Sequence, residues 1–251
     1  MNAIKTQNQP TVLSGFLLYA GYLAIFFTTW AVNGVDYTRI GESAETTKLW
    51  YAFPTLFGSI FLVTAITALG WWRIVLFDTT KAGPKWAWIL PVVMLLIIIN
   101  NFIRVNTGNL TAELVFWSFA GAVGVGFGEE MITRGSMVVG LRSRFGEVKV
   151  WLFSTLLFSA LHIPNVFFGL PLTSMPIQVV LTFIMGSGFY IIRRISGTLI
   201  IPMILHGLWD SSLFITDATG GTPSLIQFAL YPLAIVCVVA VVYSNRRQRV
   251  N

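Results

Sequence analysis

The chain has 251 residues, of which 55% are hydrophobic, 14% are aromatic and only 10% are charged. A soluble domain carries about 25% charged residues, so this composition excludes an ordinary soluble protein, and the aromatic content excludes intrinsic disorder. The single cysteine, Cys237, excludes a disulfide scaffold. The composition therefore predicts an integral membrane protein, in which the net charge of +6 belongs to loops at the membrane surface and not to a nucleic-acid site.

Apolar runs along the chain predict helices that cross the membrane, because about 20 mostly apolar residues span the hydrocarbon core. In chain order these runs are 12–34, 50–72, 86–103, 112–141, 150–163, 177–194, 197–215 and 225–243. We therefore expect an all-α polytopic membrane protein with about eight transmembrane helices. Residues 1–251 are expected to form a single integral membrane domain.

Lysine and arginine residues are distributed unequally between the two sets of predicted loops. One set, which includes both termini, holds Lys5, Arg73, Lys81, Lys85, Arg142, Arg144, Lys149, Arg193, Arg194, Arg246, Arg247 and Arg249. The other set holds Arg39, Lys48 and Arg104. Because cytoplasmic loops carry the excess of positive charge in membrane proteins, both termini are predicted to be cytoplasmic.

A few ionisable residues lie inside the predicted spans. They are Glu129, Glu130 and Arg134 in 112–141, His162 at the end of 150–163, and His206 and Asp210 in 197–215. A charge at the bilayer centre costs at least about 2.5–3.5 kcal/mol on insertion scales, so such residues usually have a partner or a function. Both histidines of the chain are in this group, which indicates a buried site.

The spacing of these residues supports one common site. Residues four apart share a helix face, so Glu130 can pair with Arg134, and His206 faces the same way as Asp210. At 1.5 Å per residue, Glu129 and the two histidines lie roughly 13–18 Å from the cytoplasmic ends of their helices. A carboxylate and two imidazoles at one depth can activate water and stabilise an oxyanion, as peptide hydrolysis requires.

Each of these patterns also has a purely structural explanation. The two glutamates and Arg134 could form an ion pair that holds helices together, His162 could cap a short span, and His206 with Asp210 could be a packing hydrogen bond. Phe158 is expected to have a packing role. Four glycines before the acids, Gly121, Gly124, Gly126 and Gly128, are expected to allow neighbouring helices to approach closely.

Three strings in these spans resemble the motifs of a known family. GEEMITRG (with Glu129, Glu130 and Arg134), FSALH (Phe158 and His162) and HGLWD (His206 and Asp210) are similar to EExxxR, FxxxH and HxxxN/D. These motifs belong to the CPBP family of CAAX-processing and bacteriocin-processing enzymes, also called Abi proteins. The order of the motifs matches, and the motif-bearing core extends over about 112–215.

The resemblance implies an intramembrane glutamic endopeptidase of the bacterial plasma membrane that works without a metal cofactor. By motif position Glu129 is the general base, His162 its partner on the water, and His206 with Asp210 forms the oxyanion side. Its substrate would be a membrane-associated peptide or protein, either prenylated or bacteriocin-like. Asp210 departs from the asparagine found in many members, because an ionised carboxylate cannot donate a hydrogen bond; we expect it to orient His206 instead.

Three other functions are compatible with the same residues. Glu129, His162 and His206 could bind zinc, although no HExxH string is present. The protein could instead be a non-catalytic immunity or scaffold protein that binds a partner through its spans. A proton-coupled transporter could also use buried carboxylates as a relay, although no inverted repeat supports this reading.

Overall fold

The structure, a computed structural model, describes residues 9–79 and 81–247. In these residues the chain is helical and forms no β-strand; the only strand-like pairing there is an isolated bridge between Phe77 and Thr198. Helices are expected in a membrane because every backbone N–H and C=O finds its partner inside the same segment. The predicted all-α class is therefore confirmed.

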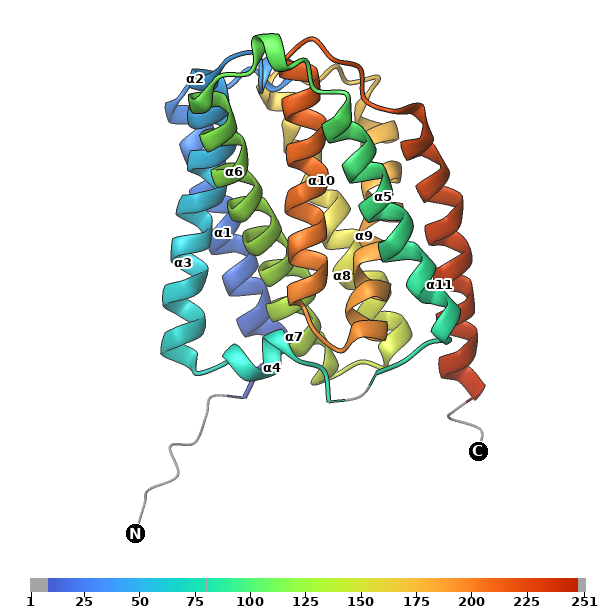
Figure 1. Ribbon diagram of the computed structural model, residues 1–251. Coiled ribbons are helices and arrows are strands. Elements are labelled where there is room, and N and C mark those ends of the chain that lie inside the picture. The colour runs from blue at the N-terminus through green and yellow to red at the C-terminus, as the bar shows by residue number, and fades with distance from the viewer. Residues whose placement is uncertain (1–8, 80, 248–251) are drawn as a thin grey trace.

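The helices form an antiparallel bundle (Figure 1). The first half of the chain forms α1 (Val12–Val32), α2 (Ala44–Thr46), the π-helical η2 (Thr47–Ala52), α3 (Phe53–Leu69), the short α4 (Trp72–Leu76), η3 (Lys85–Trp88) and α5 (Ile89–Ile103), and α2, η2 and α3 are continuous. Next come α6 (Ala112–Glu130), the π-helical η5 (Met131–Met137) and α7 (Val138–Arg142), which are also continuous. The remaining elements are α8 (Glu147–Ala160), η6 (Ile163–Phe168), α9 (Met175–Ser196), α10 (Ile200–Ala218), η7 (Leu225–Ala229) and α11 (Leu230–Arg247). Short 3-10 turns, η1 (Tyr37–Arg39) and η4 (Thr107–Asn109), lie in loops.

Six of these segments, within the described residues, are long and apolar enough to cross a membrane. They are Val12–Val32, Ala44–Leu69, Lys85–Ile103, Glu147–Phe168, Met175–Ser196 and Leu225–Val242. The two long segments outside this group are α6 with its continuation and α10, which carry Glu129, Glu130, Arg134, His206 and Asp210. The protein is therefore a multi-pass membrane protein, and the total of eight spans stays a prediction.

The helix ends follow local sequence signals. At the start of α1, Thr11 and Ser14 form a reciprocal capping box. Gly70 and Gly197 end α3 and α9 in the left-handed conformation, at φ 69° and 76°, which glycine adopts without steric cost. The beginning of α1 and the end of α11 lie at the same end of the bundle (Figure 1).

Closest packing occurs where α6 meets α10, because glycines leave no side chain between the two backbones. A Cβ atom on Gly126 would lie 2.2 Å from the Met203 carbonyl oxygen, and one on Gly207 would lie 2.2 Å from the Ala122 carbonyl oxygen. Gly121, Gly124 and Gly128 face the other side, where a Cβ would collide with Tyr51, Thr55 and Tyr22 respectively. The predicted close approach at these glycines is confirmed.

One group of cations differs from the prediction. Arg193 and Arg194, assigned to a loop from the sequence, lie in the last turn of α9 and are 0% and 7% exposed. Both pair with Asp78, at 2.8 and 2.6 Å, and so does Arg142 from α7, at 2.8 Å. Burial alone would raise the pKa of Asp78, but the hydrogen bonds and charges of Arg142 and Arg193 hold it well below its usual range. This cluster joins the ends of α7 and α9 to the loop that follows α4, at the end of the bundle predicted to be cytoplasmic.

The other cations of the predicted cytoplasmic set lie at the same end of the bundle wherever the structure describes them. Lys5 and Arg249 are outside the described residues.

Candidate active site

Glu129 and Glu130 end α6 and precede the π-helical turn Met131–Met137. Such turns are rare and often occur at functional sites. Adjacent residues of a helix point about 100° apart, so the two carboxylates enter different surroundings. Glu129 is 6% exposed and lines two cavities, whereas Glu130 is completely buried and lines neither.

Glu130 connects the two motif-bearing helices. Its Oε1 atom accepts a hydrogen bond from Arg134 Nη1 at 3.0 Å, so the expected i,i+4 ion pair is present. The same oxygen lies 3.0 Å from His206 Nδ1 on α10. Because a carboxylate only accepts, Nδ1 carries the proton and donates it to this bond. Glu130 thus fixes the orientation of the His206 ring.

Arg134 is fully buried and held by contacts from three helices. Besides Glu130, it donates a hydrogen bond to Thr133 Oγ1 at 2.8 Å, and its guanidinium carbon lies 3.7 Å from the centre of the Phe158 ring. Gly186 of α9 leaves the necessary room, since a Cβ there would lie 2.5 Å from Arg134 Nη2. Phe158 therefore stabilises the buried cation through its ring face.

His206 lies between the carboxylates. Its Nε2 atom is 4.0 Å from Glu129 Oε2 and 3.9 Å from Asp210 Oδ2, which is too long for direct hydrogen bonds. A separation of this size leaves room for a bridging water or a reacting group. The ring is also stacked on Phe189 of α9, with centroids 4.5 Å apart.

Asp210 lies on the Nε2 side of His206, with its Oδ2 atom 3.9 Å from that nitrogen, while Glu130 makes the hydrogen bond to Nδ1. The expected role of Asp210 in orienting His206 stays a prediction. Asp210 also lines both cavities beside Glu129. The hydrogen bond from Nδ1 to Glu130 turns the Nε2 side of the ring toward Asp210.

His162 reaches the same place from the end of α8. Its Nδ1 atom lies 3.1 Å from the Phe158 carbonyl oxygen. A carbonyl can only accept, so Nδ1 carries the proton and, in the neutral ring, Nε2 is left as an acceptor. His162 lines the same two cavities as Glu129 and Asp210. A water molecule in either cavity is therefore close to a carboxylate and to an unprotonated imidazole nitrogen.

The two cavities differ in character. The first, which we call the aromatic cavity, has a volume of about 90 Å³ and is lined by Phe26, Trp30, Tyr37, Ile40, Trp50, Tyr51, Thr55, Val125, Leu161, Asn165 and Phe214 in addition to Glu129, His162 and Asp210. The second, which we call the histidine cavity, has about 140 Å³ and adds His206, Phe158, Phe189 and residues of α9 and α11 to the same three. Glu129, His162 and Asp210 thus form a wall shared by both.

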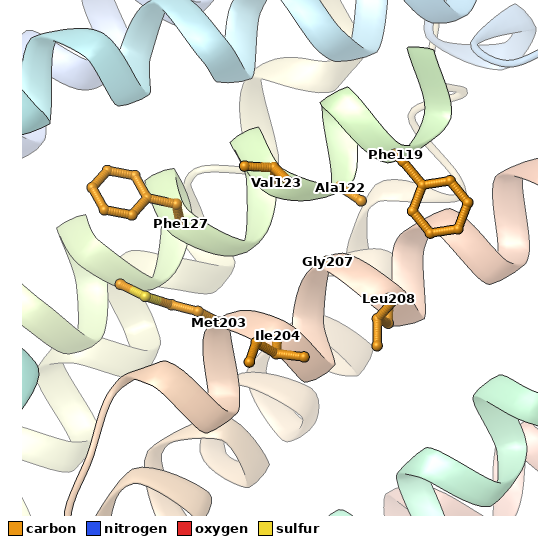
Figure 2. Close-up of a pocket in the computed structure, with 8 residues that line it drawn as sticks. All are labelled: Phe119, Ala122, Val123, Phe127, Met203, Ile204, Gly207 and Leu208. Atoms are coloured by element: carbon orange, nitrogen blue, oxygen red, sulfur yellow. The ribbon is translucent and has the colours of Figure 1, made fainter. Parts of the chain in front are cut away.

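A larger cavity lies outside this site. Figure 2 shows eight residues of α6 and α10 around it, all of them apolar side chains or glycine, and its volume is about 270 Å³. Val123 and Ile204 on its rim are 68% and 55% exposed, so this hollow opens away from the bundle. With no ionisable group in its lining, this cavity supplies no acid, base or nucleophile.

Glu129, His162 and His206 are the residues that could bind zinc. Among residues 9–79 and 81–247 no group of three or more His, Cys, Asp or Glu side chains has positions suited to holding a metal ion. Glu129 and His206 are 4.0 Å apart at their nearest atoms, and Glu130 already occupies the Nδ1 side of His206.

The fold and site define a multi-pass helical membrane protein with a buried cluster of carboxylates and imidazoles. Residues 111–212 match the family model described as type II CAAX prenyl endopeptidase Rce1-like. This match confirms the resemblance to the CAAX-processing family seen in the motifs. No curated protein and no solved structure is significantly similar to the chain.

Several residues that shape this site were missed from the sequence. Phe189 and Gly186 lie in the string MGSGF of α9, where glycines flanking a small residue could have indicated a close contact. Tyr51 lies far away in the chain, on η2, and lines the aromatic cavity. No local pattern distinguishes it from the other aromatic residues of the spans.

Proposed function

We propose that this protein is an intramembrane endopeptidase in which Glu129 activates a water molecule to cleave a peptide bond. The single observation that carries this proposal is the shared wall formed by Glu129, His162 and Asp210 between two cavities, with His206 facing it. The family match supports a peptidase, and the distances within the site support the roles proposed below.

In the proposed reaction Glu129 takes a proton from water, and the oxygen of that water forms a bond to the carbonyl carbon of the peptide. The carbonyl π electrons move to oxygen and form an oxyanion. The C–N bond then breaks, and the leaving nitrogen takes the proton from Glu129, giving a carboxylic acid and an amine. His162, through Nε2, orients the water by accepting a hydrogen bond from its other O–H group, whose hydrogen stays on the oxygen.

His206 is placed to act on the oxyanion. Glu130 holds Nδ1, so the Nε2 side of the ring faces Glu129 and Asp210. When Nε2 is protonated it can donate to the developing negative charge. Arg134 balances the charge of the fully buried Glu130, whereas Glu129 faces the two cavities. Adjacent acids thus have separate roles.

The proposed substrate is a membrane-associated peptide or protein, prenylated or bacteriocin-like, reached from the bilayer. We further propose that the protein lies in the plasma membrane of a bacterium with both termini in the cytoplasm. The orientation is supported by the excess of Lys and Arg at one end of the bundle.

The test is proteolysis by purified protein in detergent, using a fluorogenic prenylated peptide and an unlipidated peptide library. Wild type is compared with Glu129→Gln, His162→Ala and Glu113→Gln, the last being a matched control because Glu113 is an exposed residue in the first turn of α6. We expect the first two variants to lose at least about 100-fold in kcat and Glu113→Gln to match wild type.

Each reaction is repeated with a chelator. Activity that is insensitive to chelator supports the glutamic mechanism, whereas its loss would favour zinc bound by Glu129, His162 and His206. Cleavage that persists in Glu129→Gln would refute the proposed role of this residue. A wild-type protein that cleaves no peptide, together with a Glu129→Gln variant that still protects cells, would favour a non-catalytic immunity protein.

A further inference from the structure

The hydrogen-bond donors that line the aromatic cavity are almost all used inside the protein. Trp30 Nε1 donates to the Trp50 carbonyl at 2.7 Å, and Trp50 Nε1 to the Asn33 carbonyl at 3.1 Å. Thr55 Oγ1 donates to the Tyr51 carbonyl at 2.8 Å, and Asn165 Nδ2 to Gln178 Oε1 at 3.1 Å. The Tyr37 hydroxyl accepts a hydrogen bond from Gln178, which holds it in the wall of the cavity. The two tryptophans, Thr55 and Asn165 thus use these donors inside the protein and not on a ligand.

Tyr51 differs from these residues. Its side chain is 6% exposed, and its hydroxyl is buried without any hydrogen-bond partner. Buried polar groups are nearly always paired, so an unpaired one in a cavity wall calls for an explanation such as a ligand. The lining that it belongs to includes Glu129, His162 and Asp210, the same three residues that form the wall of the candidate site.

The tyrosine ring is held firmly from two sides. Its centroid lies 4.7 Å from that of Phe214 on α10, and the absence of a side chain on Gly121 leaves the space that the ring fills. The residue belongs to the π-helical turn Thr47–Ala52, and its hydroxyl interacts electrostatically with both Asp210 and Glu129. Two π-helical turns, this one and Met131–Met137, therefore bring groups to the same site.

The site otherwise has a surplus of acceptors. Glu129 and Asp210 are carboxylates, and the Nε2 atom of His162 is an acceptor in its neutral form. An oxyanion formed from a peptide carbonyl requires donors, and an ionised Asp210 cannot be one. A phenol hydroxyl fixed at the cavity wall can.

We propose that Tyr51 is a further catalytic residue, whose hydroxyl donates a hydrogen bond to the oxyanion formed on the cleaved carbonyl. This inference rests on the proposed endopeptidase function. Tyr51 lies outside residues 111–212, the part of the chain that matches the family model. The oxyanion would then be held by His206 from α10 on one side and by Tyr51 from η2 on the other.

The test compares Tyr51→Phe, which removes only the hydroxyl, with Tyr22→Phe. Tyr22 is a matched control because its hydroxyl is also buried and unpaired and interacts electrostatically with Glu129, yet it lines neither cavity. With the fluorogenic peptide that wild type cleaves, we expect kcat of Tyr51→Phe to fall about 10²- to 10³-fold, as on loss of one oxyanion donor. KM should be unchanged, and Tyr22→Phe should match wild type.

A second measurement separates chemistry from packing. A trifluoromethyl ketone analogue of the cleaved peptide adds water to become a tetrahedral mimic, and Tyr51→Phe should weaken its binding by about the same factor as kcat/KM. Binding of an uncleavable peptide with an ordinary amide should not change. This contrast depends on a donor to the tetrahedral oxygen, which a packing role does not provide.

The outcomes distinguish this inference from the function on which it rests. Wild-type kcat in Tyr51→Phe, or an equal loss of affinity for ketone and amide peptides, overturns the role of Tyr51 and leaves the Glu129 mechanism standing. Absence of cleavage by wild type overturns the proposed function and this inference together. A selective loss in kcat and in ketone affinity supports the assignment.

Discussion

Replacing Gly207 with alanine should separate the two helices on which the site depends. The new Cβ would lie 2.2 Å from the Ala122 carbonyl oxygen, and ordinary contact begins at 3.4 Å, so the backbones must move apart by about 1.2 Å. The hydrogen bond between Glu130 and His206 is 3.0 Å long, and a shift of that size would lengthen it to about 4.2 Å, beyond hydrogen-bond range.

The atom that the new Cβ would meet is a backbone oxygen, which cannot move away by changing rotamer as a side chain can. We therefore expect a cost near the upper end of the range for overpacking, about 3 kcal/mol. For a chain of this length that corresponds to a fall in Tm of roughly 6–12 °C. Misplacing a catalytic group by about 1 Å can lower the rate about 100-fold, so cleavage should fall by that order.

Unfolding can be followed with a thiol-reactive dye, because the single cysteine, Cys237, is completely buried in α11 and reacts only when the bundle opens. Gly188→Ala is the control, since a Cβ there meets its nearest atoms at 3.6 Å and alanine favours a helix by up to about 1 kcal/mol. Equal Tm values and equal cleavage rates for the two variants would contradict the importance of the backbone contact.

Three other predictions concern the charges. Arg134→Met leaves Glu130 buried without its cation, so we expect a loss of about 3–5 kcal/mol, seen as a lower Tm; an unchanged Tm would disprove the role of the pair. Asp78→Asn should remove a part of the folding stability that depends on pH. Arg142 and Arg193 lower the pKa of Asp78 against the effect of burial. The ionised Asp78 therefore contributes its full stabilisation above about pH 4, and this stabilisation is lost as pH falls toward the folded-state pKa. The variant should therefore be less stable near neutral pH and show a shallower loss of Tm below pH 4; parallel curves would contradict this. In a Cys237→Ser background, Glu45→Cys should react with an impermeant thiol reagent in intact cells and Arg144→Cys only after permeabilisation; the reverse pattern would invert the topology.

Much of the fold could be predicted because a helix that crosses a membrane needs about 20 mostly apolar residues. The run 12–34 corresponds to Val12–Val32, and 177–194 to Met175–Ser196. The run 50–72 was placed too late, because the helix begins at Ala44 under the Ser43 cap, with a polar first turn that hydropathy does not detect. The two π-helical turns were not predicted, since they depend on how neighbouring helices pack.

The candidate site was predicted where its signals are local. The i,i+4 spacing of Glu130 and Arg134 follows from helix geometry alone. The roles of Phe189 and Tyr51 arise instead from contacts between distant segments, and an aromatic residue in a span looks the same whether it faces lipid or a cavity. Arg193 was misplaced for a similar reason, because its partner Asp78 lies 115 residues earlier in the chain.

The two long helices that carry the buried ionisable groups lie directly against each other. α6 and α10 are missing from the group of segments apolar enough to cross a membrane alone, yet they pack directly on each other and on α3 and α5 (Figure 1). A carboxylate facing lipid is costly, so such helices must be shielded, and Gly126 and Gly207 remove the gap through which lipid or water could separate them. The same closeness holds Glu130 at 3.0 Å from His206. Shielding of the polar groups and positioning of the site are therefore one structural requirement, and a single added methyl group at Gly207 should disturb both.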